Sequence, residues 1–219
     1  MDETLANYLR NSLPDNKTWV TELEQAAEMD NVPIMDPISM NFVMQMIRLI
    51  KPDQILEIGT AIGYSALRML EAYPAAQIVT IERDENRYHK ANNNIRRLDK
   101  QGHITTLFGD AIEQLQQMQS RAFDLILIDA AKGKYQRFFE HAAPLLVNGG
   151  TVLSDNVLFK GYVADDGKQH PRYQKIAKKI RTYNDWLTNH PDFATTIVPI
   201  GDGIAMSIKD EGKEFPSND

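Results

Sequence analysis

The chain has 219 residues, 42% of them hydrophobic and 25% charged, which favours one globular domain with a substantial core over two domains. It contains no cysteine, and this excludes disulfides, thiolate zinc sites and cysteine nucleophiles. No apolar run reaches about 18 residues, and the acidic start MDETLANYLR does not resemble a signal peptide. We therefore expect a cytoplasmic protein with no membrane partner.

The net charge of −6 argues against general nucleic-acid binding, but the charges are unevenly distributed. Residues 1–30 hold seven acidic side chains against two basic ones, whereas residues 157–190 hold seven basic side chains against three acidic ones. The seven basic residues are Lys160, Lys168, Arg172, Lys175, Lys178, Lys179 and Arg181. Such a stretch either attracts a phosphate backbone or forms the solvated face of a surface helix. The sequence leaves both interpretations open.

The first 50 residues predict a helical cap, with helices at 3–12, 17–30 and 37–50. From residue 53, short apolar runs alternate with helical patterns. Five runs are typical of strands buried on both faces of a parallel sheet: QILEIG, QIVTIE, HITTLFGD, FDLILIDA and GGTVLSD. The helices predicted between them lie near 63–73, 84–98, 111–119 and 134–143.

The last part of the chain has a different pattern. A long helix is predicted near 171–189 and is followed by two β-type runs, ATTIVPI and GIAMSIK. The turn signal Gly201-Asp202-Gly203 between these runs predicts an antiparallel strand pair at one edge of the sheet. The tail, residues 210–219, is polar and is expected to fray.

The alternation of strands and helices predicts one domain over residues 1–219 with a Rossmann-like, doubly wound α/β fold. The expected sheet has seven strands and is mostly parallel, with an antiparallel C-terminal pair and extra N-terminal helices. In an open α/β sheet, ligands bind beyond the carboxyl ends of the strands. The polar residues at these ends are therefore the candidate site residues.

Three strand ends favour a nucleoside ligand. Gly59 and Gly63 allow a tight turn and close approach to a ligand, but their spacing is neither that of dinucleotide dehydrogenases nor that of a P-loop. Glu82, 23 residues after Gly59, can accept hydrogen bonds from ribose hydroxyls or can place charge at a helix N-terminus. Asp110 can cap the next helix and can also meet the amino group of an adenine beside the Ala111 backbone.

The next two strand ends point to a metal. One predicted strand ends at Asp129, and the following one ends at Asp155 and Asn156. Adjacent strand ends would bring these three oxygen donors together, without a histidine cluster. Such donors suit Mg²⁺ or a similar divalent cation, although Asp and Asn also commonly begin loops.

At these residues the chain resembles the cation-dependent O-methyltransferases, which include catechol O-methyltransferase and the plant caffeoyl-CoA O-methyltransferases. The resemblance runs from about Glu24 to Lys209. It is carried by ILEIGTAIGYSALRM, IVTIER, GDA, LILIDAAKGKY, SDNVLFKG and PIGDGIAMS. Within this family the chain is most similar to the bacterial tRNA 5-hydroxyuridine methyltransferases, through IDAAKGKYQRFF, DNVLFKG, YNDWLTNHPDF and IVPIGDG.

The resemblance implies S-adenosylmethionine as the cofactor. Glu82 would hold its ribose, and Asp110 with Ala111 would frame its adenine. Ser65 and the turn at Gly59 would receive its methionine end.

The resemblance also implies the remaining parts of the site. Met35 would cover the cofactor. Asp129, Asp155 and Asn156 would bind the divalent cation, with Asp129 also close to the cofactor. Lys132 would be the catalytic lysine and would accept the proton of an acceptor hydroxyl whose pKa the cation lowers. The alternative interpretation of Lys132, a surface lysine beside Gly133 and Lys134, is the weaker one.

The acceptor is expected to be 5-hydroxyuridine in the anticodon loop of a tRNA, methylated at the wobble position to 5-methoxyuridine. Ala130 and Ala131 stand where the catechol enzyme has bulky His and Trp side chains, which suggests a more open site. One alternative is a methyltransferase for small catechols or phenols. Remoter alternatives are a nicotinamide-dependent oxidoreductase and a non-catalytic nucleoside-binding module. The resemblance further implies a homodimer.

Overall fold

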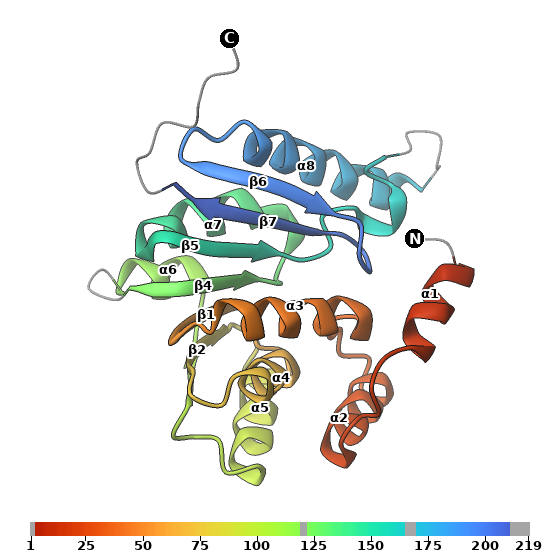
Figure 1. The fold of residues 1–219 in the computed structure, drawn as a ribbon, viewed down its shortest axis with the longest axis vertical. Coiled ribbons are helices and arrows are strands. Elements are labelled where there is room, and N and C mark those ends of the chain that lie inside the picture. The colour runs from red at the N-terminus through yellow and green to blue at the C-terminus, as the bar shows by residue number, and fades with distance from the viewer. Residues whose placement is uncertain (1–2, 119–121, 165–169, 211–219) are drawn as a thin grey trace.

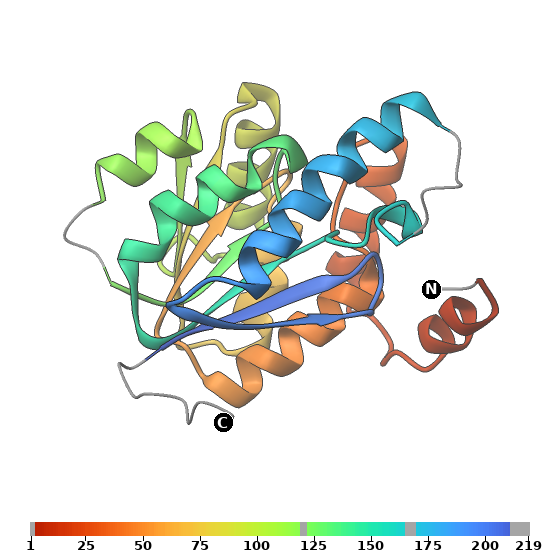
Figure 2. The ribbon, with the colours of Figure 1, turned by 90° about the horizontal axis from the view of Figure 1, so that it is seen from above.

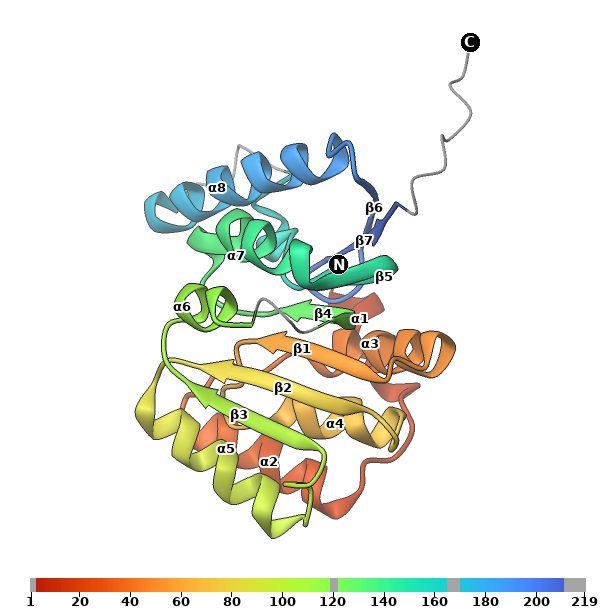
Figure 3. The same ribbon diagram turned by 90° about the vertical axis from the view of Figure 1, so that its left-hand side faces the viewer.

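The protein is built on one seven-stranded sheet. The computed structural model describes residues 3–118, 122–164 and 170–210. The strands are β1 (Gln54–Ile58), β2 (Gln77–Glu82), β3 (Ile104–Phe108), β4 (Phe123–Ile128), β5 (Leu146–Ser154), β6 (Phe193–Val198) and β7 (Ile204–Lys209). Their order is β3-β2-β1-β4-β5-β7-β6 (Figures 1 and 3). Strands β1 to β5 pair in parallel and β7 is antiparallel to both β5 and β6, so the predicted sheet is confirmed.

Helices cover both faces of the sheet. They are α1 (Glu3–Asn11), α2 (Thr18–Met29), α3 (Pro37–Ile50), α4 (Tyr64–Ala72), α5 (Glu85–Arg97), α6 (Ala111–Gln116), α7 (Tyr135–Ala142) and α8 (Pro171–Thr188). Short 3₁₀ turns are η1 (Lys132–Lys134), η2 (Ala143–Leu145) and η3 (Phe159–Gly161). Helices α2 to α5 pack on one face and α6 to α8 on the other (Figures 1 and 3).

The central strands are apolar because both of their faces are covered. In β1, Leu56 and Ile58 point into the core beneath α6 to α8, whereas Ile55 points toward α2 to α5. In β4, Ile126 likewise points into the core beneath α6 to α8, and Leu125 points toward α2 to α5. This double burial explains why these strands appear in the sequence as continuous apolar runs.

The predicted boundaries hold within one to three residues. Strand β5 begins at Leu146, three residues before the predicted run, because Asn148-Gly149-Gly150 resembles a turn although the chain continues extended there. The pairing of β4 with β5 is irregular at this point, between Phe123 and Leu125. Some predicted features lie outside the described residues. They are Lys168 of the basic stretch, the neighbouring acids Asp165 and Asp166, and the polar tail from residue 211 onward.

Helix α1 lies at the periphery of the molecule (Figure 2) and has no buried residue. Arg10 near its end forms a 3.1 Å ion pair with Asp36, just before α3, while Leu5 and Tyr8 are exposed. These contacts of α1 do not test the predicted homodimer, which stays a prediction.

Within the described ranges, no helix is both long enough and apolar enough to cross a membrane.

The order of the strands reverses between β1 and β4. From β1 the chain moves outward to β2 and β3, and then returns to the other side of β1 to form β4. At such a switch point the loops leave the sheet in opposite directions and open a crevice beyond the carboxyl ends. The candidate site lies in this crevice.

Candidate functional site

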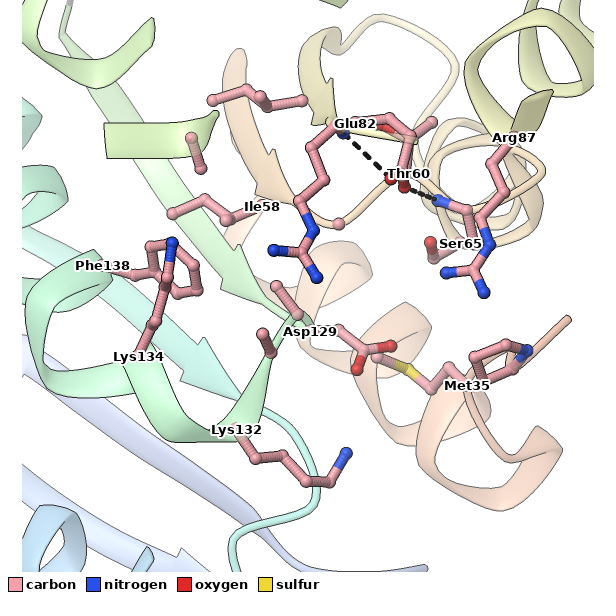
Figure 4. A pocket seen from close by; sticks show the side chains of 18 of the residues that line it. Met35, Ile58, Thr60, Ser65, Glu82, Arg87, Asp129, Lys132, Lys134 and Phe138 are labelled. Atoms are coloured by element: carbon pink, nitrogen blue, oxygen red, sulfur yellow. Dashed lines mark hydrogen bonds between the residues drawn. The ribbon is translucent and has the colours of Figure 1, made fainter. Parts of the chain in front are cut away.

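A cavity of about 300 Å³ lies beyond the carboxyl ends of β1, β2 and β4. Every site residue expected from the sequence except Asp155 lines it: Met35, Gly59, Ser65, Glu82, Asp110, Ala111, Asp129, Lys132 and Asn156. Figure 4 shows Glu82 and Lys132 on opposite sides of the cavity, with Asp129 between them. The structure therefore brings the predicted residues to one place.

The turn after β1 depends on Gly59. Its φ is +110°, and a Cβ at this position would overlap the backbone carbonyl oxygen of Asp129. The Gly59 N–H donates to the carbonyl of Ile81 at 3.0 Å, and the Asp129 N–H donates to the carbonyl of Ile58 at 3.0 Å. Backbone of β1, β2 and β4 thus meets here without an intervening side chain.

Glu82 is held rigidly at the end of β2. Its Oε2 accepts from the Ala61 N–H at 2.9 Å, and its Oε1 accepts from the N–H groups of Arg83 and Asp84, both at 2.9 Å. The residue is buried, yet it lines the cavity. It is not the N-cap of α5, since Asp84 fills that position. Oε2, which has one donor, keeps an acceptor position for a ligand hydroxyl, whereas both acceptor positions of Oε1 are occupied.

Asp110 has the capping role that its position suggested. Its Oδ1 accepts from the Ile112 N–H at 2.9 Å at the start of α6. Its Oδ2 forms a 3.1 Å ion pair with Lys134. The hydrogen bond from Ile112, followed by the contact with Lys134, lowers the pKa of Asp110. The carboxylate therefore faces the cavity as an anion whose orientation is fixed by two partners.

Ser65 is engaged with a residue that the sequence interpretation missed. Its hydroxyl donates to the carboxylate of Glu57, and Thr80 donates to the other Glu57 oxygen at 2.5 Å. Thr60 and Thr80 share a further hydrogen bond of 2.5 Å. Glu57 is fully buried, and burial, opposed by these hydrogen bonds, raises its pKa to about 7. The sequence feature that could have identified Glu57 is its position as the single acid in the apolar run Leu56-Glu57-Ile58.

Two aspartates, the half-buried Asp129 and the buried Asp155, lie side by side at the ends of β4 and β5. Ile128 pairs with Ser154 in the register of these strands, and the Asp155 N–H donates to the Ile128 carbonyl at 3.0 Å. Both carboxylate oxygens of Asp155 are buried and have no hydrogen-bond partner among the described residues. Burial, and then the charge of Asp129, raises the pKa of Asp155 well above its usual value.

Lys132 completes this part of the site. Its Nζ donates to Asn156 Oδ1 at 2.6 Å, and its charge lowers the pKa of Asp129 against the larger, raising effect of burial. Tyr135, also buried, donates through its hydroxyl to the Asp155 carbonyl at 3.0 Å. The Lys132 ammonium therefore donates a hydrogen bond to the amide oxygen of Asn156. The Asp155 carboxylate receives no hydrogen bond from the described residues.

The loop that follows Asn156 is strained and is held by the β6–β7 turn. Asn156, Phe159 and Lys160 all have positive φ, at 57°, 43° and 53°. Asp202 accepts from the Lys160 N–H through its side chain, and from the Leu158 N–H at 2.9 Å through its backbone carbonyl. The predicted turn Gly201-Asp202-Gly203 therefore does more than join two strands, because it fixes the loop beside the aspartates.

The donor set fits a divalent cation. Among the described residues, no group of three or more His, Cys, Asp or Glu could hold a metal, so any site rests on two carboxylates and one amide. The unpartnered oxygens of Asp155 and the repulsion between Asp155 and Asp129 are what a cation would relieve. Hard oxygen donors of this kind suit Mg²⁺, with water or substrate completing the shell.

Basic side chains add a feature that the strand-end argument did not anticipate. Arg83, Arg87 and Lys134 line the cavity together with Lys132. Figure 4 shows Arg87 on the Ser65 side of the cavity and Lys134 beside Phe138. Their positions follow from the packing of α5 and α7, so no strand-end pattern marks them.

The fold and the site together define a Rossmann-like nucleoside-binding protein with an acid pair and a lysine beside its pocket. The comparison with known families is more specific. The family model described as O-methyltransferase matches residues 11–210. The chain belongs to this O-methyltransferase family.

Individual relatives agree with this assignment. A catechol O-methyltransferase from Niastella koreensis is 32% identical over 176 residues, which cover 76% of this chain and 78% of the relative. A protein of solved structure from Staphylococcus aureus is 35% identical, with a TM-score of 0.85 over 94% of this chain and 98% of its own. An O-methyltransferase from Bacillus cereus, solved with SAH, is 27% identical, with a TM-score of 0.81 over 94% and 97% of the two chains.

We predict that Gly59→Ala lowers the free energy of unfolding by about 2–4 kcal/mol, because it combines an unfavourable φ with backbone overlap at Asp129. Gly102→Ala is the matched control, since nothing lies within 4 Å of its added Cβ, and we expect a change within about 0.5 kcal/mol. Urea unfolding of the two variants measures both values. Equal losses would contradict the proposed contact.

We also predict that Glu57 makes stability fall as the pH rises. The unfolded chain loses this proton near 4.5, whereas the folded protein keeps it until about 7. The folded state therefore binds more protons between these values, and stability is lost as the pH rises through them, by about 3 kcal/mol in total. Glu57→Gln should reduce the decline between pH 5 and pH 8 by roughly 2–3 kcal/mol in urea unfolding. Glu28→Gln, at an exposed position, should leave the decline unchanged, and an unchanged slope in Glu57→Gln would refute the assignment.

Proposed function

We propose that this protein is an S-adenosylmethionine-dependent, divalent-cation-assisted O-methyltransferase whose acceptor is 5-hydroxyuridine at the wobble position of a tRNA, with 5-methoxyuridine as the product. The observation that carries the chemistry is the group Asp129, Asp155, Asn156 and Lys132, assembled at one side of a nucleoside-sized cavity. Family membership supports methyl transfer to oxygen.

The cavity offers partners for each part of the cofactor. Glu82 presents a carboxylate fixed by three backbone N–H groups, with an acceptor position left on Oε2, for the ribose hydroxyls. Asp110, oriented by α6 and Lys134, lies beside Ala111 for the adenine. The buried Met35 side chain closes the cavity from the segment before α3. The Bacillus cereus relative, whose structure contains SAH, supports this use of the cavity.

The remaining residues would act on the acceptor. When bound, S-adenosylmethionine supplies the methyl group, and a cation held by Asp129, Asp155 and Asn156 lowers the pKa of the acceptor hydroxyl. Lys132 Nζ, which lies 2.6 Å from Asn156 Oδ1, is placed to accept the hydroxyl proton. Orientation supplies much of the remaining rate, since both reactants are held at strand ends.

Two features favour a nucleotide over a flat phenol. Ala130 and Ala131 line the cavity between Asp129 and Lys132, so no bulky side chain at these positions walls off the acceptor. The stretches IDAAKGKYQRFF and YNDWLTNHPDF carry the resemblance to the tRNA enzymes. A base in a single-stranded loop can enter such a site without the melting of a duplex. Small catechols remain the second candidate, because a relative named catechol O-methyltransferase is 32% identical.

The acceptor is tested by methyl transfer from labelled S-adenosylmethionine with Mg²⁺. We expect labelling of an anticodon stem-loop that carries 5-hydroxyuridine, and loss of labelling with a chelator. A simple catechol, assayed in parallel, should be labelled poorly. Labelling of catechol alone would remove the tRNA from the proposal and keep the methyltransferase chemistry.

The role of Lys132 is tested against its neighbour Lys134. Lys132→Ala should lower kcat by about 10²–10⁴-fold, the usual contribution of a general base, and should leave the Kd of S-adenosylmethionine nearly unchanged. Lys134→Ala removes the partner of Asp110 and should weaken cofactor binding with a smaller effect on kcat. Steady-state kinetics and calorimetry separate the two effects. Equal loss of kcat and cofactor affinity in Lys132→Ala would show that it has no proton-transfer role.

A further inference from the structure

One exposed face of α8 carries three basic residues in a row. Arg172, Lys175 and Lys179 follow each other at intervals of three and four residues, which places them on one side of the helix. We call them the α8 basic strip. All three are exposed, and in the described part of the chain none of their side chains forms a hydrogen bond or an ion pair.

The arrangement of the strip is electrostatically unfavourable within helix α8. Arg172 with Lys175 and Lys175 with Lys179 are like-charge neighbours on a helix, an arrangement that destabilises it. Asp185, the single acid of α8, lies too far along the helix to pair with them. Helix α4, by contrast, pairs Arg68 with Glu71 at 3.0 Å. An external anion along α8 would relieve this repulsion.

One end of the strip lies beside residues that line the cavity. The Nζ of Lys179 lies 3.3 Å from where a Cβ at Gly133 would stand. Gly133 is flanked by Lys132 and Lys134, which both line the cavity. From Lys179 to Arg172 the helix extends the positive charge outward by roughly 10 Å, on the order of three nucleotide steps of a stacked strand.

Aromatic contacts fix α8 relative to the site. The ring of Tyr173 packs edge-on against Phe159 and Tyr162, with centroid distances of 5.6 and 5.4 Å. Phe159 and Tyr162 belong to the loop that follows Asn156 and that Asp202 holds. The strip is therefore preorganised, and its position does not depend on a ligand.

We propose that the α8 basic strip binds the phosphate backbone of a single-stranded RNA loop whose base enters the cavity. This inference rests on the proposed function, since it names the surface that would distinguish a tRNA from a small phenol. Phosphates spaced along a strand match a row of cations that have no side-chain partner among the described residues, whereas a neutral phenol would gain nothing from it.

The test compares two triple variants with the same change in charge. The strip variant is Arg172→Gln, Lys175→Gln and Lys179→Gln. The control variant is Arg48→Gln, Lys51→Gln and Lys100→Gln, which are exposed residues beside the amino ends of β1 and β3, at the opposite edge of the sheet from the cavity. Binding is measured by fluorescence anisotropy with an unmodified anticodon stem-loop, which cannot be methylated. Methylation is measured with the 5-hydroxyuridine stem-loop and with the free 5-hydroxyuridine nucleoside.

For the strip variant we expect an increase of at least about tenfold in the stem-loop Kd and KM, and a salt slope of binding that is smaller by about two. Its kcat, and its KM for the free nucleoside, should stay within about twofold of the wild type, because single exposed charges contribute little at a distance. The control variant should match the wild type throughout.

Other outcomes separate this inference from the proposed function. Stem-loop binding that is equal in the strip and control variants overturns the docking surface, even if the wild type methylates the modified stem-loop. If the wild type does not methylate the modified stem-loop, the proposed acceptor is wrong. The anisotropy measurement alone then shows whether the α8 basic strip binds RNA. Strip-dependent binding to vesicles of anionic phospholipid, without binding to the stem-loop, also overturns the inference.

Discussion

The contact between the backbones of β1 and β4, just beyond their carboxyl ends, is the constraint on which the rest of the site depends. Gly59 can sit against the Asp129 carbonyl only because it has no side chain. The same contact places Asp129 between Glu82 and Lys132 (Figure 4). The Asp155 N–H then bonds to the Ile128 carbonyl, which ties the next strand end to the same point. The residues proposed for the cofactor and those proposed for the metal are thereby held in one rigid frame.

Buried acids give this frame its chemical character. Burial raises the pKa values of Glu57, Asp129 and Asp155, so keeping all three ionised would cost the folded protein free energy. Lys132 lowers the pKa of Asp129 only in part. The site is therefore stabilised by cationic ligands more than by neutral ones. A sulfonium and a divalent cation are both cations, so the same electrostatic arrangement would suit the cofactor and the proposed metal.

Sequence reasoning found the strand ends because two simple rules apply there. Continuous apolar runs indicated doubly covered strands, and parallel strands bring their carboxyl ends to one edge, which located Glu82, Asp129 and Asp155. The same rules could not find Lys134, whose partner Asp110 lies 24 residues away and meets it only after α7 has packed beside α6. Glu57 was missed for a different reason. It lies inside a strand rather than at its end, and its hydrogen bonds to Ser65 and Thr80 come from two other elements.

The proposed selection of the acceptor rests on where the structure places large side chains and charged side chains. Between Asp129 and Lys132 the cavity is lined by the two small side chains of Ala130 and Ala131. These side chains offer little apolar surface for packing against a small flat ring. Outside the cavity, the strained loop after Asn156 and the aromatic contacts of Tyr173 hold α8 beside η1. An acceptor that reaches both regions gains binding energy far from the reacting oxygen, and such remote binding can be used to orient that oxygen. The proposed polymeric acceptor would satisfy this condition, because its backbone would lie on α8 while one base occupied the cavity.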